Sequence, residues 1–304
     1  MINLKDKRMR TQIEDNRKVV HGTLIKNKNL SFNELRLKSV QLRKNLLKYI
    51  YKAKAGHTGG SLSSVDILNV LYNVVLDVDP NHFNNVDRDR YIQSKGHCVE
   101  ALFVTLADRE FFPESDLETL CQYQSHYIGH PTKKVNGVEQ NTGALGHGLP
   151  ICVGEAIAAK MDNKKHRVFT LLGDGELPEG SNWEAFLSAS HYKLDNMYAI
   201  LDNNKQQITG YNKDVMNTDS IREKLEAFGW SVKEVDGHNL EQLAEALNSG
   251  PFEVGRPNFI IAHTIKGKGI SYMEGVLKWH HGVPSKDQLD LANLELDQLA
   301  ASIS

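Results

Sequence analysis

The sequence has few cysteines, little net charge and no long apolar run. Its three cysteines, Cys98, Cys121 and Cys152, are odd in number and lack metal-type spacing, so we predict neither a disulfide framework nor a cysteine metal site. No apolar stretch reaches the length of a membrane span, and no hydrophobic segment follows the N-terminal charges. We therefore expect a reduced, cytoplasmic protein that neither enters a membrane nor is secreted.

The charge balance also limits the kinds of partner. The formal net charge is −2, whereas a nucleic-acid surface needs a clustered surplus of Lys and Arg. Residues 1–30 are rich in Lys, Arg, Asn and Asp, but acidic residues interrupt the basic run and no aromatic side chains interleave with it. We interpret 1–30 as a solvated N-terminal arm, and we expect no nucleic-acid partner.

The most informative part of the chain is a predicted strand, helix and strand. Residues 168–172 and 198–201 are apolar and of β type, and residues 182–192 between them show a helical pattern. A β-α-β unit of this length has parallel strands, which places Asp174 and Asn204 at the carboxyl ends of neighbouring strands. The sequence as a whole lacks a GxGxxG motif after its first predicted strand, which argues against a Rossmann dehydrogenase.

One acid and one amide at the same sheet edge suggest oxygen ligands for a hard cation. Mg²⁺ is suited to such a pair because it keeps few protein ligands and takes other oxygens from water and phosphates. Gly175 has no Cβ, so its backbone can approach a diphosphate closely. Gly-Asp-Gly alone is equally consistent with a tight turn after a strand.

The two halves together resemble a known family. The segments GDGELPEG, WEAFLSASHYKLDN and AILDNNK are similar to the cofactor domain of transketolases, in which GDG followed by NN is the thiamine diphosphate motif. The resemblance implies thiamine diphosphate and Mg²⁺ as cofactors, with Ca²⁺ or Mn²⁺ able to substitute. It implies that Asp174, Asn204 and the backbone carbonyl of Gln206 hold the metal, and that Gly175 contacts the diphosphate.

Two histidines lie in corners between secondary-structure elements. A predicted amphipathic helix, 32–51, ends at a glycine-rich corner that contains His57. The sequence SKGH, between a short predicted strand and the helix 99–107, places His97 at a carboxyl strand end, where a protonated or donating imidazole would stabilise anionic oxygens. The resemblance assigns His57 to the substrate and His97 to the diphosphate, whereas from the residues alone His57 is also consistent with a simple helix cap.

Glycine-rich stretches supply the next candidates. TGALGHG opens the predicted helix 149–161, and free first-turn N–H groups there form an anion cradle. The resemblance assigns Gly143, Ala144 and Leu145 to cofactor binding. It assigns His130, in a GHP element, to substrate hydroxyls; the neighbouring Gly and Pro argue against a helical two-histidine zinc site.

The remaining candidates lie further along the chain. Glu179 places a negative charge at a helix N-terminus, and the resemblance gives it a role in a proton relay between two cofactors. The predicted strand 257–261 feeds a basic, flexible loop that suits a phosphate lid, although surface lysines are more often only solvated. The resemblance assigns Lys266 to the cofactor and His280 to cofactor and substrate, with an ambiguity of one residue because His281 follows.

These features predict an α/β fold with a doubly wound, mostly parallel sheet flanked by helices. The resemblance covers a thiamine diphosphate-binding domain, 31–284, and leaves 285–304 as a C-terminal tail or helix. Since a pyrimidine-binding domain does not fit into that tail, the chain resembles the first subunit of a split transketolase. Such a subunit is active only with a C-terminal partner subunit, in an expected heterotetramer.

The implied reaction is the transfer of a two-carbon ketol unit from a ketose phosphate to an aldose phosphate. The alternatives are a subunit of another thiamine diphosphate enzyme, related to deoxyxylulose-phosphate synthases or 2-oxo acid dehydrogenases, and a non-catalytic binding subunit. The SKGH, GHP and WH histidines favour transketolase over the other thiamine enzymes. The sequence leaves the sugar phosphates open, because their specificity residues mostly belong to the partner.

Overall fold

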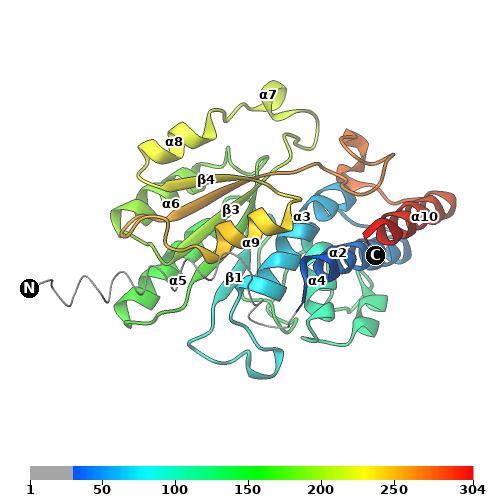
Figure 1. Ribbon diagram of the computed structural model, residues 1–304, viewed down its shortest axis with the longest axis horizontal. Coiled ribbons are helices and arrows are strands. Elements are labelled where there is room, and N and C mark those ends of the chain that lie inside the picture. Colours follow the sequence, from blue (N-terminus) through cyan, green and yellow to red (C-terminus); the bar gives the residue numbers. More distant parts are fainter. Residues whose placement is uncertain (1–29, 304) are drawn as a thin grey trace, which may run out of the picture.

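The fold is built on a parallel sheet that helices cover on both faces (Figure 1). The computed structural model describes residues 30–303, so the predicted N-terminal arm lies outside the described residues except for Leu30. The sheet has five strands in the order β1-β2-β3-β5-β4, and every neighbouring pair is parallel. The strands are β1 (Arg90–Gln93), β2 (Val168–Gly173), β3 (Met197–Asn203), β4 (Ser231–Asp236) and β5 (Asn258–His263). The predicted fold class is confirmed.

Strand residues alternate between two hydrophobic cores, one on each face of the sheet. On β2, Phe169 and Leu171 belong to the first core, whereas Val168 and Leu172 belong to the second. This alternation follows from the two-residue period of a strand, and parallel sheets are apolar on both faces because helices cover both. It explains why residues 168–172 form a continuous apolar run in the sequence.

The helices divide between the same two cores. Side chains of the first core come from α2 (Phe32–Ala53), α3 (Thr58–Val70), α4 (Val99–Asp108), α9 (Leu240–Asn248) and α10 (Lys286–Ile303). Those of the second come from α5 (Gly148–Met161), α6 (Gly180–His191) and α8 (Ile221–Ala227). Short helical segments complete the chain: Leu71–Val75, Pro80–His82, Gly96–Cys98, Glu114–Thr119, α7 (Asn212–Val215) and Leu277–His281.

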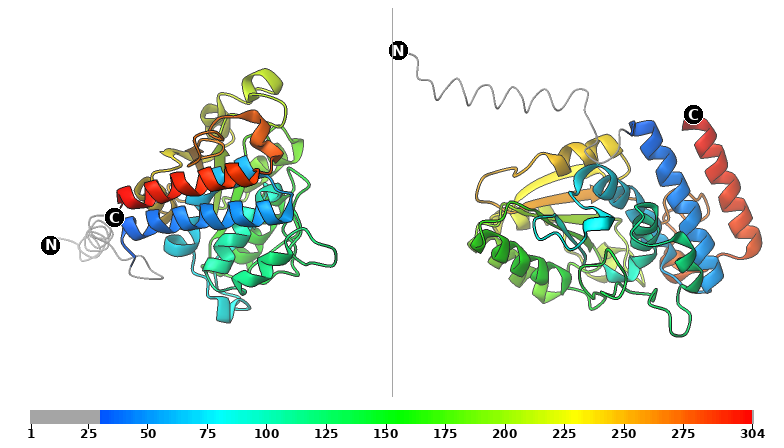
Figure 2. Two further views of the ribbon diagram at one scale, coloured as in Figure 1. Left: turned by 90° about the vertical axis from the view of Figure 1, so that its right-hand side faces the viewer. Right: turned by 90° about the horizontal axis from the view of Figure 1, so that it is seen from below.

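Helix α2 begins at a complete capping box. The hydroxyl of Ser31 accepts from the backbone N–H of Glu34 at 3.2 Å, and the Glu34 carboxylate accepts from the N–H of Ser31 at 2.6 Å. The last helix, α10, lies beside α2 (Figure 2) and buries Leu289, Ala292 and Leu296 in the first core. The C-terminal segment, for which the sequence allows a tail or a helix, is thus a helix packed on the same core.

The sequence pattern is misleading at two places. It predicts a helix over 116–123, but the chain forms a 3₁₀ helix over Glu114–Thr119 and then turns, because Cys121 has a φ of 55° and donates its N–H to the carbonyl of Tyr127. It also predicts that the helix after the glycine-rich corner begins near residue 63, whereas α3 begins at Thr58, directly after His57. All residues of α3 are buried, so tertiary packing outweighs the local capping signal.

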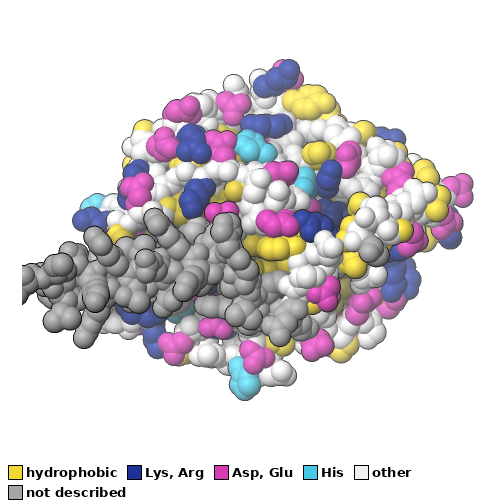
Figure 3. All heavy atoms as spheres, in the orientation of Figure 1, with side chains coloured by type: hydrophobic (Ala, Val, Ile, Leu, Met, Phe, Trp, Pro, Cys, Tyr) yellow, Lys and Arg dark blue, Asp and Glu magenta, His cyan; other side chains and the backbone are white. Residues whose placement is uncertain are grey.

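The surface carries charges of both signs. On the face in Figure 3, acidic and basic side chains are interspersed over the described elements. Among residues 30–303, no helix is both long and apolar enough to cross a membrane.

Candidate functional site

The candidate residues converge on the carboxyl edge of the sheet. Because the strands are parallel, the loops after β1, β2, β3 and β5 all leave the same edge, where open α/β sheets bind ligands. The first turn of α3 joins them, since the N–H of Gly267 donates to the carbonyl of Gly59 at 2.9 Å. The sequence motifs that are far apart in the chain therefore form one site.

Asp174 lies at the end of β2 in almost complete burial. Its carboxylate accepts from the N–H of Gly175 at 2.9 Å and from the N–H of Lys205, which follows Asn204 in the loop after β3. Burial, with repulsion from Asp202 as a second cause, raises the pKa of Asp174 to about 7. A cation bound at this carboxylate would offset both effects.

The loop after β3 supplies the other candidate metal ligands. The side-chain oxygen of Asn204 accepts from the N–H of Gln206 at 3.1 Å, so the two residues form one tight turn. The Gln206 side chain has a separate partner, because its amide donates to the carbonyl of Gly275 at 2.7 Å. The candidate donors are thus a carboxylate, an amide oxygen and a backbone carbonyl, a hard-oxygen set that fits Mg²⁺. Within the described chain, no group of three His, Cys, Asp or Glu side chains is arranged for a metal, so this set depends on amide and carbonyl oxygens.

Four histidine rings form a cluster of their own. The ring of His57 lies 5.0 Å from that of His97, 5.6 Å from that of His280 and 4.6 Å from that of His281. His97 and His280 are themselves 5.9 Å apart. Burial lowers the pKa to about 4 for His57 and to about 3 for His97 and His280, with neighbouring positive groups as a further cause. These imidazoles are therefore neutral near pH 7 and can donate and accept hydrogen bonds, which disfavours a protonated His97.

The structure brings both members of the ambiguous pair, His280 and His281, to His57. His280 is partly buried and its Nδ1 lies 2.9 Å from the Nζ of Lys266, whereas His281 is exposed. Lys266 itself is nearly buried, and burial lowers its pKa. His280 thus orients the lysine of the loop after β5, and His281 lies on the solvent side of the cluster.

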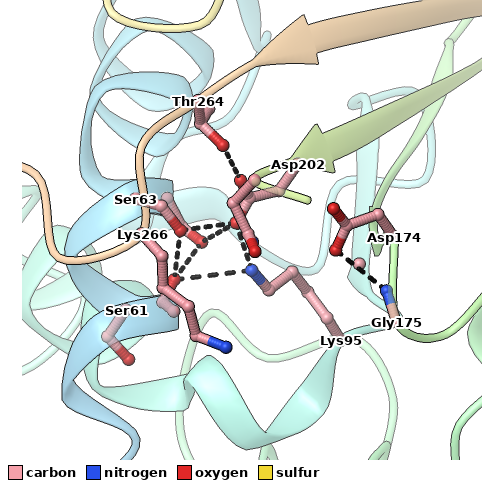
Figure 4. Close-up of polar contacts among 12 residues, drawn as sticks. Ser61, Ser63, Lys95, Asp174, Gly175, Asp202, Thr264 and Lys266 are labelled. Carbon is pink, nitrogen blue, oxygen red and sulfur yellow. Dashed lines mark hydrogen bonds and ion pairs between the residues drawn. The ribbon is translucent and has the colours of Figure 1, made fainter. Parts of the chain in front are cut away.

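A buried ion pair lies beneath the site (Figure 4). The ammonium group of Lys95, from the SKGH motif, pairs with the carboxylate of Asp202 at the end of β3. Asp202 also accepts from the hydroxyl of Ser63 at 2.6 Å and from that of Thr264. Burial alone would lower the pKa of Lys95, but the attraction of Asp202 outweighs it and raises that pKa. The pair joins the end of β3 and the loops after β1 and β5 to helix α3.

The TGALGHG loop packs directly on the neighbouring motifs. Gly143 has a φ of 137°, and a Cβ there would lie 2.4 Å from the ring of His130. Glycine at 143 therefore lets the GHP histidine approach the loop. Ala144 is exposed and Leu145 is half-buried, so both are accessible to a ligand.

Glu179 occupies the N-cap position of α6 and is exposed. His130 is likewise exposed, at the rim of the site. The predicted residues thus include the buried Asp174 and Lys266 and the partly buried His57, His97 and His280 at the sheet edge, and an exposed group of His130, Ala144 and Glu179.

Sequence reasoning missed four buried polar residues: Lys95, Glu100, Glu176 and Asp202. Lys95, Glu176 and Asp202 lie within recognised motifs at the ends of strands, which was the available signal, whereas Glu100 lies in helix α4. Their partners come from distant parts of the chain, so the sequence could not assign them roles.

Comparisons with known proteins agree with this geometry. Residues 37–296 match the family described as "Transketolase, thiamine diphosphate binding domain", so the chain belongs to the transketolase family through its thiamine diphosphate-binding domain. The sequence-based prediction of this family and of its fold is confirmed.

The comparisons also indicate which members of the family are similar. The chain is 47% identical over 264 residues to an apulose-4-phosphate transketolase subunit of Phocaeicola vulgatus, a match that covers 87% of this chain and 94% of that protein. It is 37% identical to the 6-deoxy-6-sulfo-D-fructose transketolase subunit SqwG of a Clostridium species, over 86% of this chain and 95% of that protein. It superposes on the transketolase of Campylobacter jejuni with a TM-score of 0.80 and 30% identity, over 89% of this chain but only 43% of that one. The chain therefore has the extent of a transketolase subunit of the split type and spans less than half of the solved transketolase.

Proposed function

We propose that this chain is the diphosphate- and Mg²⁺-binding subunit of a two-subunit transketolase that transfers a two-carbon ketol unit from a ketose phosphate to an aldose phosphate. The observation that carries the proposal is the meeting of Asp174, the histidine cluster and Lys266 at one sheet edge, in a chain whose match covers 94% of a named transketolase subunit. The proposal has three parts, namely a metal, a cofactor and a partner.

The metal and the cofactor diphosphate would lie between the loops after β2 and β3. Asp174, Asn204 and the carbonyl of Gln206 would hold Mg²⁺. The positive charge of the ion would stabilise the ionised form of the buried Asp174 carboxyl group. Gly175 and the loop of Gly143, Ala144 and Leu145 would lie against the diphosphate, with His97, Lys266 and His280 as further contacts. When bound, thiamine diphosphate supplies the carbon nucleophile that breaks and forms the carbon–carbon bond of the sugar.

The histidines would hold and move protons at the substrate hydroxyls. Because burial keeps His57 and His280 neutral near pH 7, each can donate one hydrogen bond and accept another. His130 at the rim would contact a substrate hydroxyl further from the bond that breaks. Glu179, exposed at the N-cap of α6, would join a proton relay that extends to a second copy of the site.

A partner subunit would supply the pyrimidine-binding half of the site and most contacts to the sugar phosphate. The solved transketolase is more than twice as long as the part that this chain matches, whereas the similar subunits are of nearly equal length. We infer a heterotetramer with two copies of each chain, and a division into an arm (1–30), a cofactor domain (31–284) and a C-terminal helix. The cytoplasmic location stays a prediction.

The test is an activity assay of the chain alone and after addition of the product of a neighbouring C-terminal transketolase gene. Thiamine diphosphate and Mg²⁺ are present in both arms, and the donors include xylulose 5-phosphate and apulose 4-phosphate, the sugar phosphate in the name of a 47% identical relative. We expect ketol transfer only from the pair. Turnover by the isolated chain would contradict the divided site, and cofactor uptake by the pair without ketol transfer would favour another thiamine enzyme or a non-catalytic binding subunit.

A further inference from the structure

Glu176 is a buried acid in the loop after β2, directly after Gly175. Its side chain is 1% exposed, and it is not among the candidate ligands of the metal or the cofactor. Its own backbone is fixed by the turn, because its N–H donates to the carbonyl of Gly173 at 2.9 Å and its carbonyl accepts from the amide of Asn182 at 2.8 Å. The side chain therefore starts from a rigid base.

The carboxylate of Glu176 joins its own loop to two others, because it accepts hydrogen bonds from both of them and from the end of β2. One oxygen accepts from the hydroxyl of Ser94 and from the N–H of Gly146 at 2.9 Å. The other oxygen accepts from the N–H of Gly173 at 3.2 Å. Ser94 begins the SKGH motif, Gly146 lies in the TGALGHG motif, and Gly173 is the residue before Asp174.

The same loops are in direct contact with one another. A Cβ on Gly148 would lie 2.5 Å from the Cα of Ser94, and a Cβ on Gly96 would lie 2.7 Å from the backbone nitrogen of Gly143. Packing this close leaves little room for water to replace a lost partner, and buried N–H groups need an acceptor. Glu176 is thus the group that satisfies donors from three motifs at their point of contact.

We propose that Glu176 is a positioning residue that holds the three cofactor loops in their binding arrangement without contacting the cofactor itself. This inference rests on the proposed function. Loops that already have their binding arrangement before the cofactor arrives lose less conformational entropy when it binds. We therefore expect Glu176 to increase the affinity for the cofactor. A carboxylate suits this role because it has two acceptor oxygens and no donor hydrogen.

The variant Glu176→Gln tests this positioning role. Glutamine has one acceptor oxygen for Ser94 and Gly146, but its N–H₂ group faces the N–H of Gly173. The repulsion between these two donors displaces the side chain and weakens its bonds to the other two loops. Thiamine diphosphate binding in the presence of Mg²⁺ is measured by calorimetry on the reconstituted pair of subunits. We expect affinity to fall about tenfold to a hundredfold, in keeping with loss of a charged hydrogen-bond acceptor.

Asp89→Asn is the matched control at the opposite, amino-terminal edge of the sheet. Asp89 is also buried and also joins separate segments. It accepts from the N–H of Asp77 at 3.1 Å and from the N–H of Arg167 at 2.8 Å, and it forms an ion pair with the Arg167 guanidinium at 2.6 Å. We expect this variant to lose stability but to bind the cofactor as the wild type does. If Glu176 contributed only to the stability of the fold, both variants would lose stability and both would keep wild-type cofactor affinity.

Hydrogen exchange on the cofactor-free chain provides a readout that does not depend on the cofactor. Glu176→Gln should accelerate exchange in peptides that contain 94–98, 142–148 and 173–175 together, whereas Asp89→Asn should not. If Glu176→Gln does not fold, Ser94→Ala removes one donor only and should weaken cofactor binding severalfold.

The outcomes separate the inference from the proposed function. Wild-type affinity in Glu176→Gln, or an equal loss in Asp89→Asn, overturns the positioning role. Failure of the wild-type pair to bind thiamine diphosphate at all overturns the proposed function and this inference with it.

Discussion

Glu100 should make the stability of the fold decrease as the pH rises through neutrality. Its carboxyl group is fully buried on α4 and accepts from the hydroxyl of Ser61 at 2.8 Å and from the N–H of His57 at 3.1 Å. Neither partner carries a positive charge, so burial raises the pKa of Glu100 from 4.5 to about 7. The unfolded chain therefore loses this proton at a lower pH than the folded chain does.

The sign and size of the effect follow from that difference. Below about pH 4.5 both states hold the proton and Glu100 has no effect; between about pH 4.5 and 7 only the folded state holds it, so the free energy of unfolding falls as the pH rises. A pKa difference of about 2.5 pH units corresponds to a loss of about 3 kcal/mol, which is complete above pH 7. This is a large part of the stability of a typical domain.

Glu100→Gln should remove this loss. Glutamine can accept from the N–H of His57 and donate to the hydroxyl of Ser61, so the variant resembles the protonated wild type at every pH. The free energy of unfolding is measured in urea at pH 5 and at pH 8 for both proteins. We expect the difference between variant and wild type to be about 2 to 3 kcal/mol more favourable to the variant at pH 8 than at pH 5. Groups that titrate in both proteins cancel in this comparison.

Glu245→Gln, at an exposed position on α9, is the control for the chemical change. It should shift the free energy of unfolding by the same small amount at both pH values. A difference between Glu100→Gln and the wild type that stays constant within about 1 kcal/mol from pH 5 to pH 8 would refute the reasoning.

Two further predictions concern stability. Lys95→Met leaves Asp202 as a buried, unpaired charge and should lower the free energy of unfolding by about 3 to 5 kcal/mol. The double variant Lys95→Met with Asp202→Asn should lose much less stability. Equal losses of stability in the two proteins would show that the charge of Asp202 is not the cause. Ser31→Ala removes the capping box of α2 and should lower the free energy of unfolding in urea by about 1 kcal/mol. Ser302→Ala, at an exposed position near the end of α10, should cause no measurable loss. An unchanged stability of Ser31→Ala would contradict the capping argument.

Much of the sheet edge could be predicted from the sequence because its signals are local. An apolar run that stops at Gly-Asp-Gly marks both the end of a strand and the position of Asp174, and a glycine-rich stretch before a helix marks the loop of Gly143. The parallel arrangement then follows from the connection between the strands, since a helix separates them.

The electrostatics of the site could not be predicted in the same way. The neutral state of His57 depends on burial by elements from distant parts of the chain, and the partner of Lys95 lies more than a hundred residues away. Gln206 illustrates the same limit, because its side chain bonds to Gly275 and no local pattern relates the two. Charge states and contacts between distant segments are properties of the folded chain.

The most direct test of the account is calorimetric titration of the reconstituted subunits with thiamine diphosphate, with and without Mg²⁺, for the wild type and Asp174→Ala. The wild type should bind the cofactor saturably and only when the divalent ion is present, and Asp174→Ala should bind it weakly or not at all. Uptake that needs no metal, or that persists unchanged in Asp174→Ala, would contradict the claim that the loops after β2 and β3 hold a metal-bound diphosphate.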